Sequence, residues 1–457
     1  MNRVYEKSFG AAKIVTGSNH LIDTGTSKIL IDCGMFQGED EELNYKNFEF
    51  NPKEIDALIL THGHLDHVGR IPLLYKHGFR GKVFATEATF DILKVVLKDS
   101  AKLQMEDYKT REKKAKRLNQ NAKHPLYTKK DVKEALKLMK KVITHYNKPI
   151  HITKDIIAVF KNAGHIIGSS FIEIFYQKKH IVFSGDLGNK STPLLPSPQK
   201  PGVADSLFIE STYGDRNHKS FKESKKELID AITNTIKKGN VIIPTFAIER
   251  AQLLLCILKE MSQKGLLKNA KVYLDSPMAK KVTNVYKKHS YLLSKECQKY
   301  KKHPFEFKEL KLIKSVNESK KINNIKKGAI IIAGSGMLSG GRILHHLKHN
   351  IWNEFSSLIF VGYQAKGTLG RKIIDGATFI EIYNEKIAVN AKIYTINGFS
   401  AHADQSELIE WMKEFDRLEK IYLIHGEEEK QKIFQETIQK TLKKTSHIVE
   451  MKETIYL

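Results

Sequence analysis

Hydrophobic residues in the first two hundred positions fall into short runs that alternate with polar loops. The runs are too short for typical helices and are bounded by polar or glycine-containing segments, so they predict β-strands. The predicted strands span 28–32, 57–61, 82–86, 156–162, 171–175 and 180–184. Many short strands around a few helices predict a layered α/β domain with a sheet core.

From about residue 211 the pattern changes to longer helices that alternate with apolar strands. Predicted helices cover 222–238 and 248–262, and predicted strands cover 241–244, 271–275, 329–333 and 358–362. This alternation is typical of a parallel sheet covered by helices. The chain therefore contains a second domain of different architecture, in which the polar stretch 296–327 is the least defined part.

Between the predicted strands of the first domain, residues 94–141 form a helical, strongly basic segment. It could be an arm that faces the substrate or a solvated pair of helices. The second interpretation is preferred slightly, because charged runs usually form solvated helix faces.

The length of 457 residues exceeds one ordinary hydrophobic core and predicts two domains. No apolar run has the length of a membrane span, and the N-terminus lacks the apolar core of a signal peptide. We therefore expect a cytoplasmic protein with no membrane partner. Its cysteines are Cys33, Cys256 and Cys297, too few and too scattered for a disulfide framework.

A formal net charge of +25, from 76 basic and 51 acidic residues, predicts attraction to a polyanion such as nucleic acid. A general excess of lysine across solvated helices would give the same number. The charge thus favours a nucleic-acid partner without deciding it.

The most specific feature follows the predicted strand at 57–61. The sequence Thr61-His62-Gly63-His64-Leu65-Asp66-His67 places three imidazoles and one carboxylate in six positions. Neutral imidazoles suit zinc, and a carboxylate beside them suits a hydrolytic site with an open position for water. This cluster predicts a metal site. Its four side chains are enough to contribute ligands to two metal ions.

Further candidate site residues each lie beside small residues at the end of an apolar run, where loops meet sheet ends. They are Asp32, His165, Asp186 and His402. Asp32 would hold a ligand histidine in the correct tautomer, although a turn aspartate is the alternative. Asp186 is a natural bridging carboxylate, and together with the histidine cluster the set is complete.

Motifs in the second half narrow the prediction. They are Glu-Ser-Thr-Tyr-Gly at 210–214, Leu-Asp-Ser-Pro-Met-Ala at 274–279, the glycine-rich 334–342 and Phe-Ser-Ala-His-Ala at 399–403. In this order around the histidine cluster, they resemble the β-CASP nucleases of the metallo-β-lactamase fold. The likeness is strongest to short bacterial and archaeal relatives of the pre-mRNA 3′-end cleavage endonuclease.

The resemblance implies an α/β fold: a metallo-β-lactamase αββα sandwich with an inserted β-CASP domain, whose parallel sheet is flanked by helices. The expected domains are 1–208, the first part of the metallo-β-lactamase domain; 209–388, the β-CASP domain; and 389–457, a return segment that completes the first domain.

The resemblance also implies a ligand set for two zinc ions, with manganese as an alternative metal. His62, His64 and His165 would bind one ion, Asp66, His67 and His402 the other, and Asp186 would bridge them. The expected catalytic residues are Asp66, Asp186, Glu210 and His402. Two ions roughly 3.5 to 4 Å apart can stabilise both the attacking and leaving oxygens of a phosphodiester displacement.

A second group is expected to support the ligands or contact substrate. Arg371 and Lys372 stand where the eukaryotic pattern has a histidine, which leaves the general acid open, and they could neutralise a phosphate instead. The glycine-rich loop could present N–H groups to phosphate. The group comprises Asp32, Ser335, Arg342, His346, Arg371, Lys372, Ser400 and His425.

The expected function is a zinc-dependent ribonuclease that hydrolyses RNA phosphodiester bonds by metal-activated hydroxide, in RNA processing or decay. RNA is favoured over DNA because His402 matches the RNA-processing branch. Endonuclease and 5′-exonuclease modes both stay open, as does a homodimer. The alternatives are a small-molecule thioester or lactone hydrolase and a non-catalytic RNA-binding scaffold.

Overall fold

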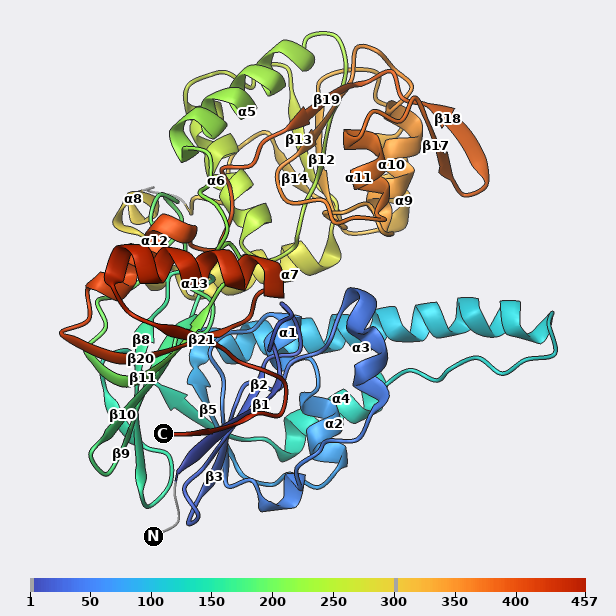
Figure 1. The fold of residues 1–457 in the computed structure, drawn as a ribbon. Coiled ribbons are helices and arrows are strands. Elements are labelled where there is room, and N and C mark those ends of the chain that lie inside the picture. The colour runs from blue at the N-terminus through green and yellow to red at the C-terminus, as the bar shows by residue number, and fades with distance from the viewer. Residues whose placement is uncertain (1–3, 300–302) are drawn as a thin grey trace. The chain divides into compact units, whose positions relative to one another are not determined.

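The computed structural model describes residues 4–299 and 303–457 and divides the chain into two units. Unit 1 contains residues up to Lys190 together with 197–217 and 402–457, and unit 2 contains 191–196 and 218–401. The chain thus leaves unit 1, builds unit 2 and returns, as an inserted domain requires. Figure 1 shows the course of the chain by colour.

Unit 1 is built on two seven-stranded sheets. The first has the order β22 (Thr454–Tyr456), β1 (Tyr5–Gly10), β2 (Asn19–Asp23), β3 (Lys28–Ile31), β4 (Ala57–Ile59), β5 (Lys82–Thr86) and β6 (Lys140–Thr144). The second has the order β21 (Ser446–Ile448), β20 (Arg417–Ile424), β11 (Val203–Glu210), β10 (Lys179–Phe183), β9 (Ser170–Tyr176), β8 (Ile156–Asn162) and β7 (Pro149–His151). The C-terminal strands β20, β21 and β22 therefore complete sheets that the N-terminal residues begin.

The two sheets pack face to face because each strand alternates its apolar side chains between two cores. Ile29 and Ile31 of β3 share one buried cluster with Ile181 and Phe183 of β10. Val182, between the last two, belongs instead to a cluster on the outer face of the second sheet. This two-residue period is the signature of a strand buried on both faces.

Helices cover the outer faces of both sheets (Figure 1). On the second sheet, Trp411 of α12 (Gln405–Lys413) and Phe434 of α13 (Glu428–Leu442) join the outer cluster. The first sheet carries α1 (Leu65–Val68), α2 (Ile71–Lys76), α3 (Glu87–Lys116) and α4 (Lys129–Leu138), with the 3₁₀ helices η1 (Gly38–Tyr45) and η2 (Pro52–Glu54) nearby in sequence. Unit 1 is therefore an αββα sandwich.

The basic segment 94–141 contains most of α3 and all of α4, in agreement with the preferred prediction of a solvated pair of helices. The first half of α3 buries Ile92, Leu93, Val96, Leu97 and Ala101, but no side chain after Ala101 in this helix is buried. Its C-terminal half extends beyond the sandwich as a solvated arm (Figure 1). The helix continues because residues 102–116 are mostly strong helix formers such as lysine, glutamate and alanine.

Unit 2 is built on a six-stranded parallel sheet. Its order is β14 (Leu310–Leu312), β13 (Lys271–Leu274), β15 (Ala329–Ala333), β12 (Val241–Pro244), β16 (Ser357–Phe360) and β19 (Lys392–Thr395), and a separate hairpin joins β17 (Phe379–Ile382) to β18 (Glu385–Ala388). The helices are α5 (Phe221–Thr235), α6 (Arg250–Gln263), α7 (Pro277–Lys288), α8 (Lys295–Gln298), α9 (Val316–Ile322), α10 (Arg342–Asn350) and α11 (Leu369–Ile374), with the 3₁₀ helix η3 (Ser290–Leu292). The predicted helix–strand alternation matches this parallel sheet.

Both boundaries between the units lie further along the chain than the expected 208/209 and 388/389. Residues after β11 stay with unit 1, because the carbonyl of Arg216 accepts a hydrogen bond from the Gln405 backbone. At the second boundary β19 pairs with β16 and so holds residues up to Ala401 in unit 2. Backbone pairing, which composition does not reveal, sets these limits.

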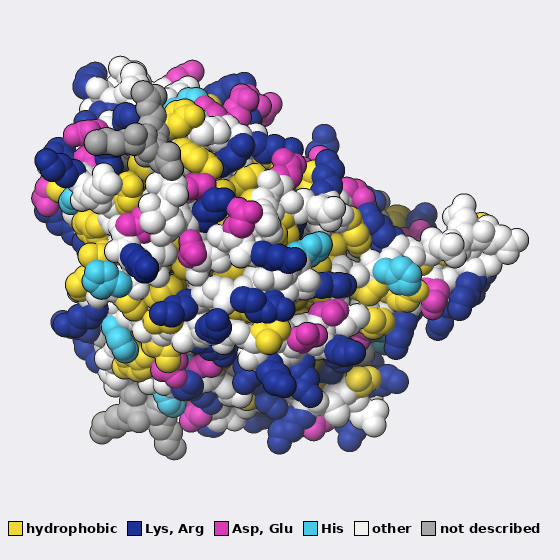
Figure 2. Space-filling view, turned by 90° about the horizontal axis from the view of Figure 1, so that it is seen from below, with side chains coloured by type: hydrophobic (Ala, Val, Ile, Leu, Met, Phe, Trp, Pro, Cys, Tyr) yellow, Lys and Arg dark blue, Asp and Glu magenta, His cyan; other side chains and the backbone are white. Residues whose placement is uncertain are grey.

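None of the described helices is long and apolar enough to cross a membrane. On the face shown in Figure 2, lysine and arginine side chains are scattered among aspartate and glutamate and do not gather into one patch. The net charge alone therefore does not mark a binding surface on this face.

Candidate metal centre

The histidine cluster spans the loop between β4 and α1 and the single turn of α1 itself, which carries Asp66 and His67, and the backbone there is tightly fixed. The carbonyl of Thr61 accepts a hydrogen bond from Ser170 N (2.8 Å), and the carbonyl of Asp66 accepts one from Ser18 N (2.9 Å). A Cβ on Gly63 would lie 2.6 Å from a methyl group of Ile92 in α3, so only glycine allows this approach. The loop conformation holds the ligand side chains before any ion binds.

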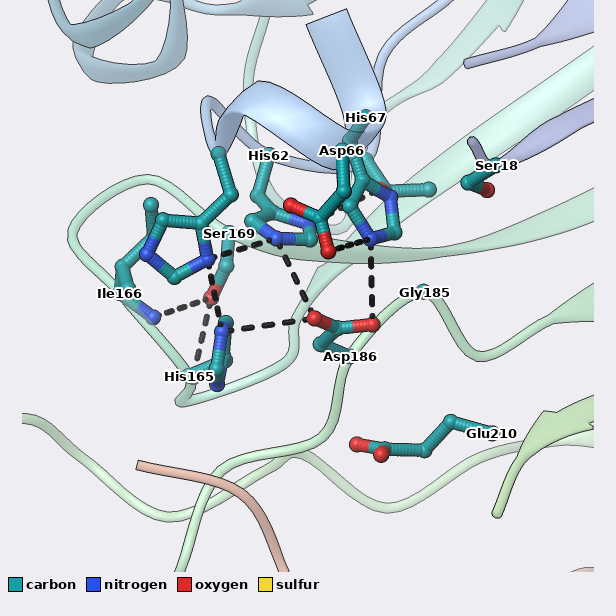
Figure 3. Close-up of polar contacts among 12 residues, drawn as sticks. Ser18, His62, Asp66, His67, His165, Ile166, Ser169, Gly185, Asp186 and Glu210 are labelled. Atoms are coloured by element: carbon teal, nitrogen blue, oxygen red, sulfur yellow. Dashed lines mark hydrogen bonds and ion pairs between the residues drawn. The ribbon is translucent and has the colours of Figure 1, made fainter. Parts of the chain in front are cut away.

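Four of the expected ligands converge in a first group: His62, His64, His165 and Asp186. Nδ1 of His64 lies 3.1 Å from Nε2 of His62 and 3.1 Å from Nε2 of His165. Oδ2 of Asp186 lies 3.4 Å from Nε2 of His62. Figure 3 shows the side chains of His62, His165 and Asp186 pointing toward one common region.

A second group contains Asp66, His67 and His425. Nε2 of His425 lies 3.9 Å from Asp66 Oδ2 and 3.6 Å from Asp186 Oδ1. Oδ1 of Asp186 is also 3.4 Å from Nε2 of His67. Asp186 therefore directs one oxygen at each group, as a bridging carboxylate would.

The structure differs here from the expected ligand set, which gave His402 to the second group. His425, expected only as a supporting or substrate-contacting residue, occupies that position instead. It directly follows β20, which pairs in parallel with β11 at the centre of the second sheet. The sequence signal was present in Leu-Ile-His-Gly at 423–426, a strand-end histidine of the same kind as His165.

His402 lies beside His165 of the first group, with ring centroids 4.4 Å apart, and pairs with Glu210. Its Nδ1 is 3.2 Å from Glu210 Oε2 and 4.0 Å from Asp186 Oδ2. The side chain of Glu210 is fully buried, whereas that of His402 is 22 % exposed. Burial disfavours the imidazolium, but the Glu210 carboxylate outweighs this and raises the pKa of His402 to about 9.

The donor set of the two groups fits divalent metal ions. Within the described residues, Nε2 of His67 and Oδ1 of Asp186 are buried and make no hydrogen bond, a costly state unless a ligand satisfies them. Burial lowers the pKa of His64 to about 3 and also lowers the pKa of His165, so both are neutral as metal binding requires. Nitrogen and carboxylate donors in this proportion suit zinc.

Asp32 orients one of these ligands. Its Oδ2 accepts a hydrogen bond from Nδ1 of His67 (2.7 Å), which leaves Nε2 of that ring free to coordinate. The same carboxylate accepts hydrogen bonds from the backbone and hydroxyl of Thr61. Burial lowers the pKa of His67, but the carboxylates of Asp186 and Asp32 raise it more, so that its pKa lies well above the ordinary value. The negative potential of these carboxylates also attracts cations.

Ser169 is a supporting residue that the sequence patterns did not indicate. Its hydroxyl accepts hydrogen bonds from the backbone N–H groups of His165 (3.0 Å) and Ile166 (3.3 Å), as Figure 3 shows. It thereby fixes the turn that carries His165. A serine four residues after a ligand histidine is too common a pattern to indicate this role.

The remaining expected substrate-contacting residues lie in unit 2. Arg342 and His346 both bind the buried carboxylate of Asp275. Arg371 pairs with Asp375 one helical turn later, and Ser335 contacts Ser339. The remaining two, Lys372, which is exposed, and Ser400, which is buried, belong to the same unit. The residues of the two ligand groups described above, by contrast, all come from unit 1.

A four-layer αββα sandwich that carries two groups of histidine and carboxylate donors defines a metallohydrolase of the metallo-β-lactamase superfamily. Residues 14–115 match that superfamily, 251–373 match the Beta-Casp domain, and 386–449 match the Zn-dependent metallo-hydrolase RNA specificity domain. The chain belongs to the β-CASP family of nucleases within this superfamily.

Relatives cover nearly the whole chain. It is 41 % identical over 426 residues to Ribonuclease TTHA0252 of Thermus thermophilus. The aligned region covers 92 % of this chain and 93 % of that protein. The chain is 33 % identical over 458 residues to Transcription termination factor FttA of Methanocaldococcus jannaschii, over 96 % of this chain and 69 % of that protein.

A solved structure of a protein of unknown function from Enterococcus faecalis V583 matches with a TM-score of 0.55 and 12 % identity. The match covers 100 % of both chains. At this low identity it supports the fold alone.

Proposed function

We propose that this protein is a two-zinc ribonuclease that hydrolyses RNA phosphodiester bonds. The observation that carries the proposal is the position of Asp186, whose two carboxylate oxygens face the two ligand groups separately. Support for RNA comes from the relatives, one named as a ribonuclease, and from the match of residues 386–449 to an RNA specificity domain.

The structure supports a revised assignment of the ligands. His62, His64 and His165 would hold one zinc ion, and Asp66, His67 and His425 the other, with Asp186 shared between them. Such a pair of ions supplies a nucleophile at neutral pH and neutralises charge on the phosphoryl oxygens. Asp32 keeps His67 in the tautomer that coordinates through Nε2.

His402 and Glu210 are assigned to proton delivery. His402 is the partly exposed member of the pair, and its raised pKa keeps it protonated at neutral pH. It would give a proton to O3′ as the P–O3′ bond breaks, which leaves a 3′-hydroxyl and a 5′-phosphate. Glu210 holds the ring in place, because its Oε1 is itself fixed by the Leu187 backbone N–H at 2.6 Å.

The test uses zinc-loaded protein and end-labelled RNA that carries either a 5′-phosphate or a 5′-hydroxyl. We expect cleavage by the wild type and by the control Asp155→Asn, and none by Asp186→Asn. Asp155 is a suitable control because it accepts three hydroxyl hydrogen bonds outside the metal centre, from Thr24, Ser27 and Thr153. Product lengths separate internal cutting from 5′-end degradation.

The proposal fails if the wild type cuts neither RNA, or if Asp186→Asn cuts as fast as the wild type. Hydrolysis of a generic thioester at a higher kcat/KM than RNA would indicate a small-molecule hydrolase instead. A zinc content near zero after purification and reconstitution would indicate a non-catalytic protein.

A further inference from the structure

Unit 1 contains a pocket of about 230 Å³ that includes none of the candidate metal ligands. It lies between the end of η1, helix α2 and the segment that returns from the α3 arm. Its walls include the rings of Tyr45, Phe48, His77 and His124 and the cationic groups of Arg70 and Lys123. No aspartate or glutamate lines it.

Arg70 is the central feature of this pocket. Its side chain is only 5 % exposed, and its Nε has no hydrogen-bond partner within the described residues. Nη2 reaches only the carbonyl of Lys46, at 3.5 Å, and no described carboxylate pairs with the guanidinium. A buried, unpaired cation is costly, so this arrangement calls for an anionic ligand.

The rest of the wall is aromatic and basic. The Arg70 guanidinium lies 4.3 Å from the centroid of the Phe48 ring, and the Lys123 ammonium lies 3.5 Å from that of Tyr45. Lys123 also pairs with Glu42, whose side chain is 79 % exposed, and such surface pairs contribute little stability. Lys123 can therefore turn to a ligand at small cost.

Aromatic rings beside a buried arginine match a ligand that combines a phosphate with a flat base. Arginine binds phosphate through paired N–H groups, and aromatic side chains stack on nucleobases. The volume lies just below the range of small-molecule sites, roughly 300–1,000 Å³, and exceeds what a bare anion needs.

We propose that this pocket binds one phosphorylated nucleoside, with its phosphate on Arg70 and Lys123 and its base against Tyr45 and Phe48. Where that nucleotide belongs to an RNA chain, the inference rests on the proposed ribonuclease function and makes the pocket an RNA-holding site apart from the metal centre. A free mononucleotide is the other source of the same chemistry.

The α3 arm supports RNA as the source. The loop that returns from its tip supplies Lys123 and His124 to the pocket, and the ring of His124 stacks on Tyr108 of the arm at 5.2 Å. Six of the nine residues from Lys109 to Arg117 are lysine or arginine, and one is acidic. These side chains could follow the phosphates of nucleotides that flank the one in the pocket.

The test compares the full zinc-loaded chain with the variants Lys123→Glu and Tyr45→Ala. The control is Lys178→Glu, which reverses an exposed charge in the turn between β9 and β10. Calorimetric titrations use AMP and, separately, inorganic phosphate. We expect each pocket variant to weaken one AMP binding event at least tenfold, the control to leave it unchanged, and phosphate to bind more weakly than AMP.

A second titration uses a short oligoribonucleotide in the Asp186→Asn background, which prevents cleavage. If Lys123→Glu weakens binding of the oligoribonucleotide tenfold, whether or not AMP binds, the result supports the pocket as a site for a nucleotide within RNA. If Lys123→Glu weakens binding of AMP but not of the oligoribonucleotide, the result supports a free mononucleotide as the ligand. The proposal is overturned if Lys123→Glu and Lys178→Glu behave alike with both probes, or if phosphate binds as tightly as AMP.

Cleavage kinetics separate this proposal from the proposed function. If both hold, Lys123→Glu raises KM for RNA and leaves kcat and the zinc content unchanged. If the wild type cuts no RNA while Lys123→Glu still weakens AMP binding, the proposed ribonuclease function is wrong and the proposed nucleotide pocket is supported. If RNA is cut with the same KM by both proteins and neither probe distinguishes them, the pocket fails and the function stands.

Discussion

Replacement of Asp32 by asparagine should weaken the second metal position without changing its ligands. Asp32 is 1 % exposed and accepts four hydrogen bonds, from His67 Nδ1 (2.7 Å), Thr61 N (2.8 Å), Thr61 Oγ1 (2.7 Å) and, more weakly, Ser18 Oγ (3.5 Å). Its φ is +61°, a backbone conformation that asparagine adopts readily and alanine does not. Asparagine therefore removes the charge and keeps both size and backbone.

The magnitude follows from the hydrogen-bonding capacity of the amide. A carboxylate accepts at both oxygens, whereas asparagine must turn its NH₂ group toward either His67 or Thr61, both of which donate. If the NH₂ group faces His67, the proton moves to Nε2 and blocks coordination. Supporting residues of this kind change metal affinity by about 10- to 100-fold, or about 1.4 to 2.7 kcal/mol.

The measurement is competition for zinc with a chromophoric chelator, which resolves a tighter and a weaker ion. We expect only one of the two dissociation constants to rise, because Asp32 contacts His67 and none of His62, His64 or His165. Asp155→Asn is the matched control and should leave both constants unchanged. The reasoning is refuted if Asp32→Asn binds both ions as tightly as the wild type, or if both positions weaken equally.

Three further predictions concern the rest of the site. His425→Ala should reduce bound zinc from two ions to one, whereas His402→Ala should retain both and lose cleavage, as measured by metal analysis beside RNA assays. Glu210→Gln removes the carboxylate that contributes most to the raised pKa of His402. The proton donor should then be lost at lower pH, so the alkaline limb of the kcat profile should shift to lower pH. Chelation should lower the Tm and zinc should restore it, because an ion that binds only folded protein at a thousand times its Kd adds about 4 kcal/mol.

Each of these has a clear opposing result. Loss of one zinc from His402→Ala, with two retained by His425→Ala, would return His402 to the ligand set. An alkaline limb that stays in place or moves upward in Glu210→Gln would remove His402 from proton delivery. A Tm that is identical with and without chelator, in protein shown to have lost its zinc, would show that the ions do not stabilise the fold.

The α/β class of the fold could be predicted from the sequence because the patterns that indicate strands and helices extend over only a few neighbouring residues. Alternating or continuous apolar runs predicted β3, β4, β5, β8, β9 and β10 of unit 1 and β12, β13, β15 and β16 of unit 2, but missed strands at or next to a sheet edge, such as β1, β7, β14 and β22. The change to helix–strand alternation near residue 211 marked the second architecture. The domain limits could not be predicted to the residue. They depend on which strand a segment pairs with, such as β19 with β16, and such pairing joins residues far apart in sequence.

The candidate site divides along the same line. The sequence by itself indicated His62, His64, Asp66 and His67, since they lie within six consecutive residues and are therefore close in space. His165 and Asp186 also followed from strand-end patterns. Two more strand-end or loop histidines, His402 and His425, lie near the C-terminus. The sequence resemblance assigned the last ligand position to His402 and placed His425 among the supporting residues.

Only the tertiary structure shows how the surroundings of these two histidines differ. The parallel pairing of β20 with β11 places His425, at the end of β20, beside Asp66 and Asp186, while a β-bridge between His402 and Gly188 places His402 against Glu210. A ligand set is defined by distances of a few ångströms between side chains, and strand order and register fix those distances. For the histidine cluster the chain itself supplies that proximity. For His425, the ligand proposed in place of His402, only the completed second sheet does.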